Sequence, residues 1–406
     1  FLRFNSQNTF VKDMWKNCYS GISRANTAIV KIPEIKMNES KKNRLIAEAR
    51  TLRALYYFNL VRFFGDVPLI LDLKTVEDSK GPRDSKELIY DQIIEDLTFA
   101  EEHLPLRSEY SASDEGRINK GAAKILFGKV YLTKGDFQKA KDKLAEVVEH
   151  ESEYGFGLHK DYHANWLRDT EAGIEAVLYI EYKEPPFQHN GEMALAGPKY
   201  SIPGSLGISA LNEADIPTQE LYDQFDNRDL RKKTNFKTEF AHLKTGEILK
   251  SSIPLSGKFW VEGLETGDRC DVNMHIIRYA DAILMYAEAL NEVGESTKAL
   301  AMLNRIRERA FGDDSGNFKP MSKDEFRTAI LNERRLEFPH EGHRWFDLVR
   351  TGTFIQRMKE HSAYEAKVAE ANKTEIAQNI KEHMILMPIP QSEIDLNPNL
   401  VQNAGY

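Results

Sequence analysis

Histidines and carboxylates gather in the stretch NERRLEFPHEGHRWFDLVRTG, residues 332–352. Within it, HEGH places His340 and His343 on either side of Glu341, and these are residue types that bind zinc. A zinc-protease helix needs its two histidines four residues apart, with the glutamate directly after the first. Here the histidines are three apart, and Gly342 between them, with a proline just before, favours a break in the helix. We therefore predict no metal site in this stretch.

Other catalytic and metal-binding motifs fit no better. The stretch FGDDSGNFKPMSKD offers Asp313, Ser315 and Asn317 at the spacing of a calcium loop, but Phe318 stands where that loop needs glycine. The sequence has no phosphate-binding loop, no dinucleotide-binding glycine motif after a strand, and no G-x-S-x-G motif. We therefore expect no cofactor. A glycosidase stays open, because its two carboxylates can lie far apart in sequence.

Charged residues interrupt two apolar helix faces. Arg53 falls on the apolar face of the helix expected around residues 41–64, and Glu333 and Glu337 fall on a second such face. A buried charge needs a partner, because the loss of its water is costly. We therefore predict that these glutamates pair with an arginine, either Arg53 or else Arg344. Such pairing would make a structural joint between helices, and a catalytic carboxylate pair is the alternative.

The elements that hold these residues are expected to be mostly α-helical. Two segments carry small residues, large apolar residues and glycine at the same offsets; they are Gly128, Tyr131, Gly135, Ala140, Leu144 and Val147, and Ala287, Leu290, Gly294, Ala299, Leu303 and Ile306. Each segment predicts a helical hairpin, because small residues let helices approach and glycine ends the first helix. The spacing resembles tetratricopeptide hairpins, which stack around one continuous core. Further helices are expected around 86–103 and 322–338.

The pattern changes between roughly residues 155 and 275. This stretch contains KEPPFQ, AGPKYSIPGS and SSIPLSG, whose prolines and glycines indicate loops and short strands. EAVLYIEYK is expected to be a strand. We therefore expect a single domain over residues 1–406. Its helical frame would cover about 10–150 and 275–360, and its loop-rich, partly β insert about 155–275.

The composition excludes some classes of protein. The net charge of −8 argues against nucleic-acid binding, which needs a basic face for phosphate contacts. No apolar run reaches the roughly 20 residues that a membrane-spanning helix requires. The two cysteines make neither a zinc pattern nor a disulfide framework.

Several stretches resemble signatures of the SusD/RagB family. AEARTLRALYYFNLVRFFGDVPLIL (47–71) resembles its first signature, and residues 332–352 resemble its C-terminal signature. Three further stretches match in order: MWKNCYSGISRANTAI (14–29), PTQELYDQFDNRDLR (217–231) and ILMPIPQSEIDLNPNLVQNAGY (385–406). Together they span nearly the whole chain. One departure is Ala404, where the family commonly has proline.

The resemblance implies a SusD-like α-α superhelix that binds a nutrient and is not an enzyme. It implies a cell-surface lipoprotein of the outer membrane, held by a lipid anchor that is not in this chain. SusD-like proteins usually bind an oligosaccharide or polysaccharide and cap a SusC-like TonB-dependent transporter, as part of polysaccharide utilisation. Two alternatives stay open: the same scaffold binding a peptide or another nutrient, and a tetratricopeptide scaffold binding protein partners through a groove.

Aromatic residues of the insert are the candidates for contacting a sugar. A sugar presents an apolar C–H face and a ring of hydroxyls, which suits an exposed aromatic plane edged by polar groups. The candidates are Trp166 (with Tyr162, Asn165 and Arg168 nearby), Phe187, His189, Tyr200 and Trp260. The resemblance adds Asn5 and Asn8, because the family often uses the segment before its first helix. The alternative for each aromatic is packing of the insert against the helices.

Overall fold

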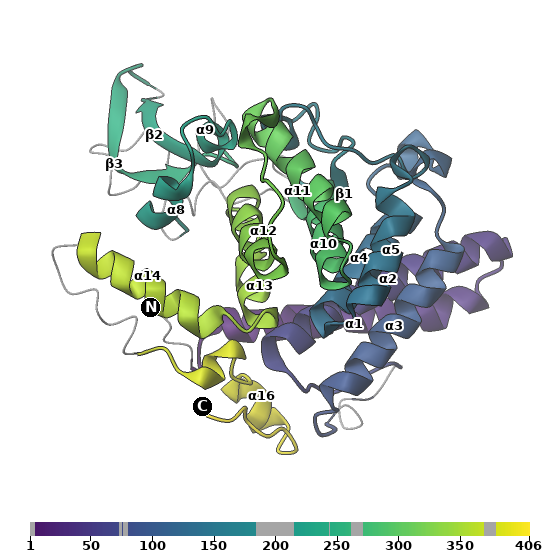
Figure 1. Ribbon diagram of the computed structural model, residues 1–406. Coiled ribbons are helices and arrows are strands. Elements are labelled where there is room, and N and C mark those ends of the chain that lie inside the picture. Colours follow the sequence, from purple (N-terminus) through teal and green to yellow (C-terminus); the bar gives the residue numbers. More distant parts are fainter. Residues whose placement is uncertain are drawn as a thin grey trace. The chain divides into compact units, whose positions relative to one another are not determined.

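The computed structural model describes residues 5–72, 75, 80–183, 215–242, 244–260, 271–368 and 379–406. This part of the chain is mostly α-helical, as predicted, with a small amount of antiparallel sheet (Figure 1). The chain divides into two compact units. The first comprises Phe1–Asp136 and Trp345–Tyr406, and the second comprises Phe137–Arg344.

The first unit is built from helices that begin at well-defined caps. Its helices are α1 (Thr9–Lys31), α2 (Glu39–Phe64), α3 (Lys86–His103), α4 (Lys120–Lys134), α13 (Arg344–Arg350, which starts at the boundary), α14 (Phe354–Val368) and α16 (Gln391–Leu396). Side-chain oxygens of Asn8, Asn38, Ser85 and Asn119 accept backbone N–H groups at the starts of α1 to α4. Such caps satisfy donors that the first turn leaves unpaired. In sequence order, α1 packs on α2, α2 on α3 and α3 on α4.

Arg53 joins three helices of this unit. Its Nε and Nη2 atoms donate to the carboxylate of Asp96 on α3 at 2.8 and 2.7 Å, and its Nη1 donates to Asn26 on α1 at 2.9 Å. All three side chains are buried. The prediction that Arg53 is buried and paired is confirmed, but the predicted partner, Glu333 or Glu337, was wrong. Helical periodicity identifies the buried face of α2, but it does not identify the helix that packs against that face.

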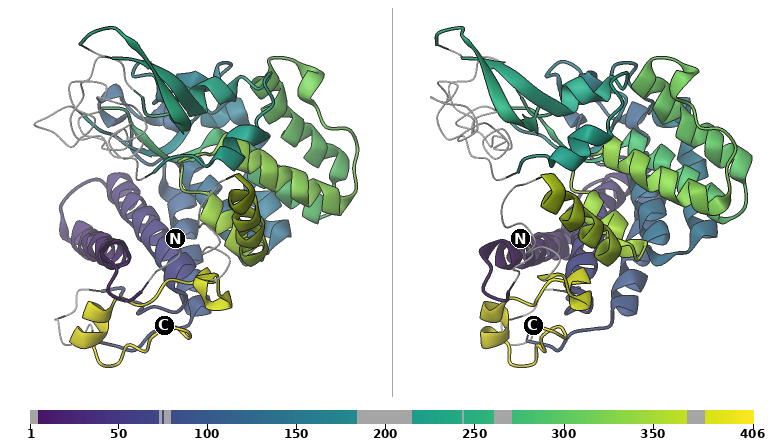
Figure 2. Two further views of the ribbon diagram at one scale, coloured as in Figure 1. Left: turned by 90° about the vertical axis from the view of Figure 1, so that its left-hand side faces the viewer. Right: turned by 60° about the vertical axis from the view of Figure 1, so that its left-hand side comes forward.

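The second unit combines helices with two small sheets. Its helices are α5 (Phe137–Val148), α6 (Glu151–Tyr154), α8 (Gln219–Gln224), α9 (Arg231–Asn235), α10 (Tyr279–Glu292), α11 (Ser296–Phe311) and α12 (Lys323–Glu337), with the 3-10 turn η4 (Tyr162–Trp166). The strands are β1 (Ala176–Ile180), β2 (Phe236–Ala241), β3 (Ile248–Ser256) and β4 (Met274–Arg278). β1 pairs antiparallel with β4, and β2 pairs antiparallel with β3 in a two-stranded ribbon (Figure 2). The strand predicted in EAVLYIEYK is confirmed as β1.

The predicted hairpin around Gly294 is confirmed as α10 and α11, which pack on each other. Gly294 adopts φ +88° between the two helices, a conformation that favours glycine. The seam residues Ala287, Leu290, Ala299, Leu303 and Ile306 are all buried. α5 and α12 also pack on α10. In the other predicted segment, Gly135 ends α4 in the left-handed conformation, as expected.

Candidate functional site

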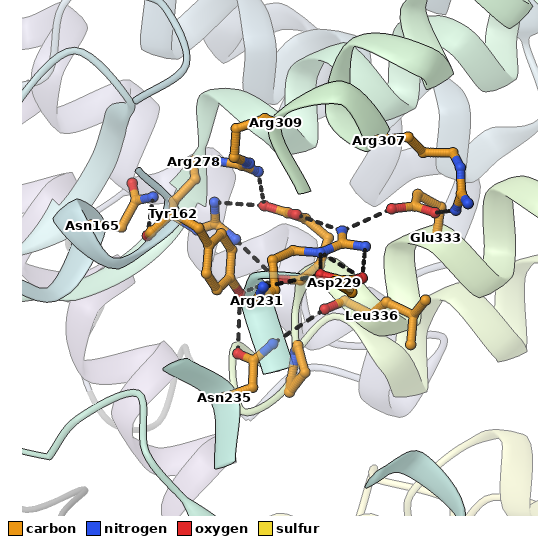
Figure 3. A network of polar contacts seen from close by, with 12 residues as sticks. Tyr162, Asn165, Asp229, Arg231, Asn235, Arg278, Arg307, Arg309, Glu333 and Leu336 are labelled. Atoms are coloured by element: carbon orange, nitrogen blue, oxygen red, sulfur yellow. Dashed lines mark hydrogen bonds and ion pairs between the residues drawn. The ribbon is translucent and has the colours of Figure 1, made fainter. Parts of the chain in front are cut away.

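A network of buried charges connects α11, α12, α9 and β4 within the second unit (Figure 3). Its cations are Arg231, Lys258, Arg278, Arg307 and Arg309, and its anions are Glu175, Asp229, Glu333, Glu337 and Glu341. Positive and negative side chains are therefore equal in number. Such a balance is what allows charges to remain in a region without water. We call this set the charge network.

Glu337 lies at the centre of the charge network. Its carboxylate contacts Arg231 at 2.9 Å, Arg278 at 3.0 Å and Arg309 at 2.6 Å. Burial by itself would raise the pKa of Glu337, but the three guanidinium groups outweigh burial and lower the pKa to about 2. At neutral pH this side chain is therefore ionised and cannot donate a proton as a general acid.

Glu333 is paired as well, but not with the arginines that we predicted. Its two carboxylate oxygens contact Arg231 and Arg307, each at 2.7 Å. Arg344 instead donates to the carbonyl of Leu331 at 3.2 Å. The predicted ion-paired joint is thus confirmed, while Arg344 as its arginine was wrong. The true partners come from α9 and α11, and sequence periodicity does not show which helices meet.

Trp166 lies inside the core beside the charge network. Its side chain is 4% exposed and its ring packs on Tyr162, with ring centroids 4.8 Å apart. The Lys258 ammonium and the Arg278 guanidinium lie 4.6 and 5.2 Å from the Trp166 ring, within cation–π range. Tyr162 in turn donates its hydroxyl to the Glu337 carbonyl at 2.7 Å. This burial corrects our expectation that Trp166 offers an accessible surface to a sugar.

The asparagines near the start of the chain hold backbone groups. Asn8 caps α1, and its side chain accepts the N–H of Val11 at 3.2 Å. The side chain of Asn5 accepts the N–H of Gln7 at 3.0 Å. Ligand binding by Asn5 and Asn8 stays a prediction. Three other candidates lie outside the described residues: Phe187, His189 and Tyr200.

An open polar hollow of about 540 Å³ lies in the second unit. It is lined by residues that follow η4, that follow β1 and that precede β4. They are Arg168, Glu171, Glu181, Tyr182, Lys183, Asp271 and Asn273. We call it the Arg168 hollow. Charged, amide and phenol groups thus converge from three separate segments of the chain.

Hydrogen bonds and an ion pair fix the walls of the Arg168 hollow. Arg168 Nε meets Asp271 Oδ1 at 2.6 Å, and both side chains remain partly exposed. Asn273 is buried; it donates its backbone N–H to Glu171 at 2.9 Å and accepts the N–H of Tyr182 at 2.9 Å. Burial raises the pKa of Glu171 to about 7, although the N–H of Asn273 opposes the rise. Glu171 is therefore partly protonated near neutral pH.

These groups suit the recognition of a polar ring compound. Guanidinium and amide N–H groups can donate to hydroxyls, carboxylates can accept from them, and a tyrosine ring can contact C–H groups. Sequence inspection placed Arg168 near a candidate but missed the rest of the hollow. The available signal was Tyr182, the next-to-last residue of the predicted strand EAVLYIEYK.

A second hollow of about 430 Å³ lies at α8, α9 and the start of β2. Its lining includes three lysines beside aromatic rings; the members are Tyr222, Asn227, Lys232, Lys233, Phe236 and Lys237, among others. We call it the lysine hollow. Trp260 is partly exposed nearby, with its ring 4.7 Å from that of Phe240 and 5.9 Å from the Lys237 ammonium. A role of Trp260 in ligand binding stays a prediction.

The described ranges also bear on membrane spanning and on metal binding. No helix there is both long enough and apolar enough to cross a membrane. No group of three or more histidine, cysteine, aspartate or glutamate side chains there is placed to hold a metal ion.

Comparison with known proteins identifies the family. Residues 3–132 match a family model described as starch-binding associating with outer membrane, and residues 252–406 match the model of the SusD family. Over 438 residues the chain is 31% identical to SusD-like protein P2 of Formosa agariphila, covering 98% of this chain and 81% of that protein. The chain therefore belongs to the SusD family, as its signature stretches indicated.

Solved structures are similar over almost the full chain. A SusD superfamily protein from Parabacteroides distasonis is 28% identical with a TM-score of 0.83, covering 99% of this chain and 87% of that one. A laminarin binding SusD-like protein is 29% identical with a TM-score of 0.78, covering 97% of this chain and 86% of that one.

Proposed function

We propose that this chain is a cell-surface protein that binds an oligosaccharide or polysaccharide, catalyses no reaction, and delivers the glycan to a SusC-like TonB-dependent transporter. The observation that carries the proposal is the Arg168 hollow, an open polar site on a family scaffold. The names of relatives support the class of ligand, since one structure is described as laminarin binding and one family model as starch-binding.

In the proposed complex, the glycan occupies the Arg168 hollow. The Arg168–Asp271 pair can donate to one hydroxyl and accept from its neighbour, while the ring of Tyr182 contacts the C–H face of the sugar. Asn273 would hold the three segments of the hollow together, because it lies before β4 and its hydrogen bonds reach Glu171 after η4 and Tyr182 after β1. A site fixed before binding loses little entropy when the ligand arrives.

We further propose that the protein lies at the outer membrane, held there by a lipid anchor. The description of the family model that covers residues 3–132 supports this location. We expect the protein to cap the transporter, because a glycan that it releases must pass directly into that transporter.

Calorimetric titration with a panel of oligosaccharides tests the binding site. We expect Arg168→Ala to weaken binding of the best neutral glycan at least about tenfold, because charge-assisted hydrogen bonds to the ligand are lost. The matched control is Arg228→Ala, which removes an exposed arginine paired with Asp226 at 2.7 Å in the same unit, outside both hollows. The site is wrong if the two variants bind alike.

The same incubations test the absence of catalysis. We expect the glycan to be recovered intact after prolonged incubation with the protein, as judged by chromatography of reducing ends. Release of shorter saccharides by the wild type, abolished in Glu171→Gln, would show instead that the Arg168 hollow hydrolyses its ligand.

A further inference from the structure

The lysine hollow carries an excess of positive charge. Two carboxylates also line it, but each already has a cationic partner: Asp229 contacts Arg231 at 2.7 Å, and Glu239 contacts Lys250 at 3.0 Å. Arg231 belongs to the charge network, and Lys250 extends from β3. These two carboxylates are therefore matched by cations outside the lining, and they do not neutralise Lys232 or Lys233.

Lys232 and Lys233 meet no carboxylate within the described residues. The Lys232 ammonium is held by neutral acceptors, the carbonyl of Phe225 at 3.3 Å and the side chain of Asn227 at 3.0 Å. Lys233 is exposed beside it. Hydrogen bonds to neutral oxygens fix the position of an ammonium group without cancelling its charge. The hollow thus presents one positioned cation and one free to reach a ligand.

Aromatic rings flank these cations. The Lys232 ammonium lies 4.4 Å from the ring centroid of Tyr222, and Lys237 brings its ammonium to 5.9 Å from the ring of Trp260. Aromatic planes can contact the C–H face of a sugar, whereas an inorganic anion has no C–H face to place against them. The rings, together with the Lys232 and Lys233 ammonium groups, favour a ligand that carries both a sugar ring and a negative charge.

We propose that the lysine hollow binds the acidic group of a saccharide, either the carboxylate of a uronic acid or a sulfate ester. This inference rests on the proposed glycan-binding function and adds the class of glycan: an acidic one. A neutral saccharide unit would occupy the Arg168 hollow, and an acidic unit would occupy the lysine hollow.

His163 provides an internal reporter for this site. Burial lowers the pKa of His163, and the charges of Lys237 and Lys233 lower it further, while Asp161 opposes them. An anion bound between these lysines would offset their repulsion. We therefore expect the pKa of His163, followed by NMR, to rise when the acidic ligand binds.

Titrations with three probes test the proposal: tetragalacturonate, a sulfated agaro-oligosaccharide and neutral laminaritetraose. We expect at least one acidic probe to bind, with an affinity that falls as salt rises. The triple variant Lys232→Ser, Lys233→Ser, Lys237→Ser should lose at least about tenfold in affinity for that probe, if each charge contributes about two- to fivefold. The difference between the uronate and the sulfate arms identifies the acidic group.

Single variants separate a specific site from general charge attraction. Lys233→Ser and Lys319→Ser each remove one exposed lysine of the second unit, but only Lys233 lines the hollow. We expect weaker binding of the acidic probe only in Lys233→Ser. Equal losses in both variants, or acidic probes that bind no better than neutral ones, would overturn the proposal while leaving the proposed function intact. If no saccharide of either kind binds, the proposed function itself fails and this inference with it.

Discussion

The charge network and the Arg168 hollow lie in the same compact unit and are built from the same residue types. In the charge network every carboxylate is buried against arginine or lysine, and Glu337 alone touches three guanidinium groups. In the hollow the Arg168–Asp271 pair remains partly exposed. The same types of side chain are buried against one another in the charge network and remain accessible to solvent in the Arg168 hollow.

The pKa values of two glutamates express this difference. Surrounding arginines lower that of Glu337 to about 2, whereas burial raises that of Glu171 to about 7. A carboxylate saturated with arginines is poorly suited to bind a ligand, because the ligand would have to displace these partners. The densest charge in a sequence therefore need not mark its functional site.

The largest expected effect comes from breaking the charge network. Glu337→Gln leaves three buried guanidinium groups short of a carboxylate, and we expect the free energy of unfolding to fall by about 3–5 kcal/mol. Urea denaturation followed by circular dichroism measures this change. Arg168→Ala is the counterpart from the hollow and should cost no more than about 1 kcal/mol, since exposed ion pairs contribute little. Similar losses of unfolding free energy in both variants would show that the two regions contribute alike to stability and would contradict the distinction between them.

A smaller effect should appear in the pH dependence of stability. The folded-state pKa of Glu171 is about 7, above its ordinary 4.5, so the folded protein holds a proton that the unfolded chain has released. This contribution is fully present below about pH 4.5, and it is lost as the pH rises through about 7. We expect the fall in unfolding free energy between these pH values to be shallower in Glu171→Gln than in the wild type.

Glu337 should act in the opposite direction. Its folded-state pKa is below the ordinary value, so its contribution is present above about pH 4.5 and is lost as the pH falls toward about 2. Unfolding free energies measured across the acid range should therefore decline more in the wild type than in Glu337→Gln. If Glu171→Gln instead removed this decline at acid pH, the decline would belong to Glu171 and not to Glu337, and our assignment would be wrong.

Local features of the fold were predictable from the sequence. The helix expected around residues 86–103 forms as α3 over the same residues, because Ser85 supplies a cap and its apolar positions follow the helical period. The hairpin of α10 and α11 was predictable from Gly294 and the small residues of its seam. Each of these signals lies within a few turns of chain, where propensity and periodicity act directly.

Contacts between distant segments were not predictable in this way. The sequence showed that Glu333 and Glu337 need cations, but Arg231 and Arg309 reach them only through the packing of α9 and α11. Trp166 illustrates the same limit, since its burial depends on Lys258 and Arg278 from remote segments. The Arg168 hollow forms only when its three separate segments come together, so no local sequence pattern predicts it.

The most direct test of the central claim is the position of a bound oligosaccharide in a crystal structure of the complex, using the tightest neutral ligand from the titrations. We expect a sugar ring in the Arg168 hollow, with hydroxyls about 3 Å from Arg168 or Asp271 and a C–H face against Tyr182. The charge network should be unchanged. A glycan bound elsewhere with the Arg168 hollow empty, or one that inserts between Glu337 and its arginines, would contradict it.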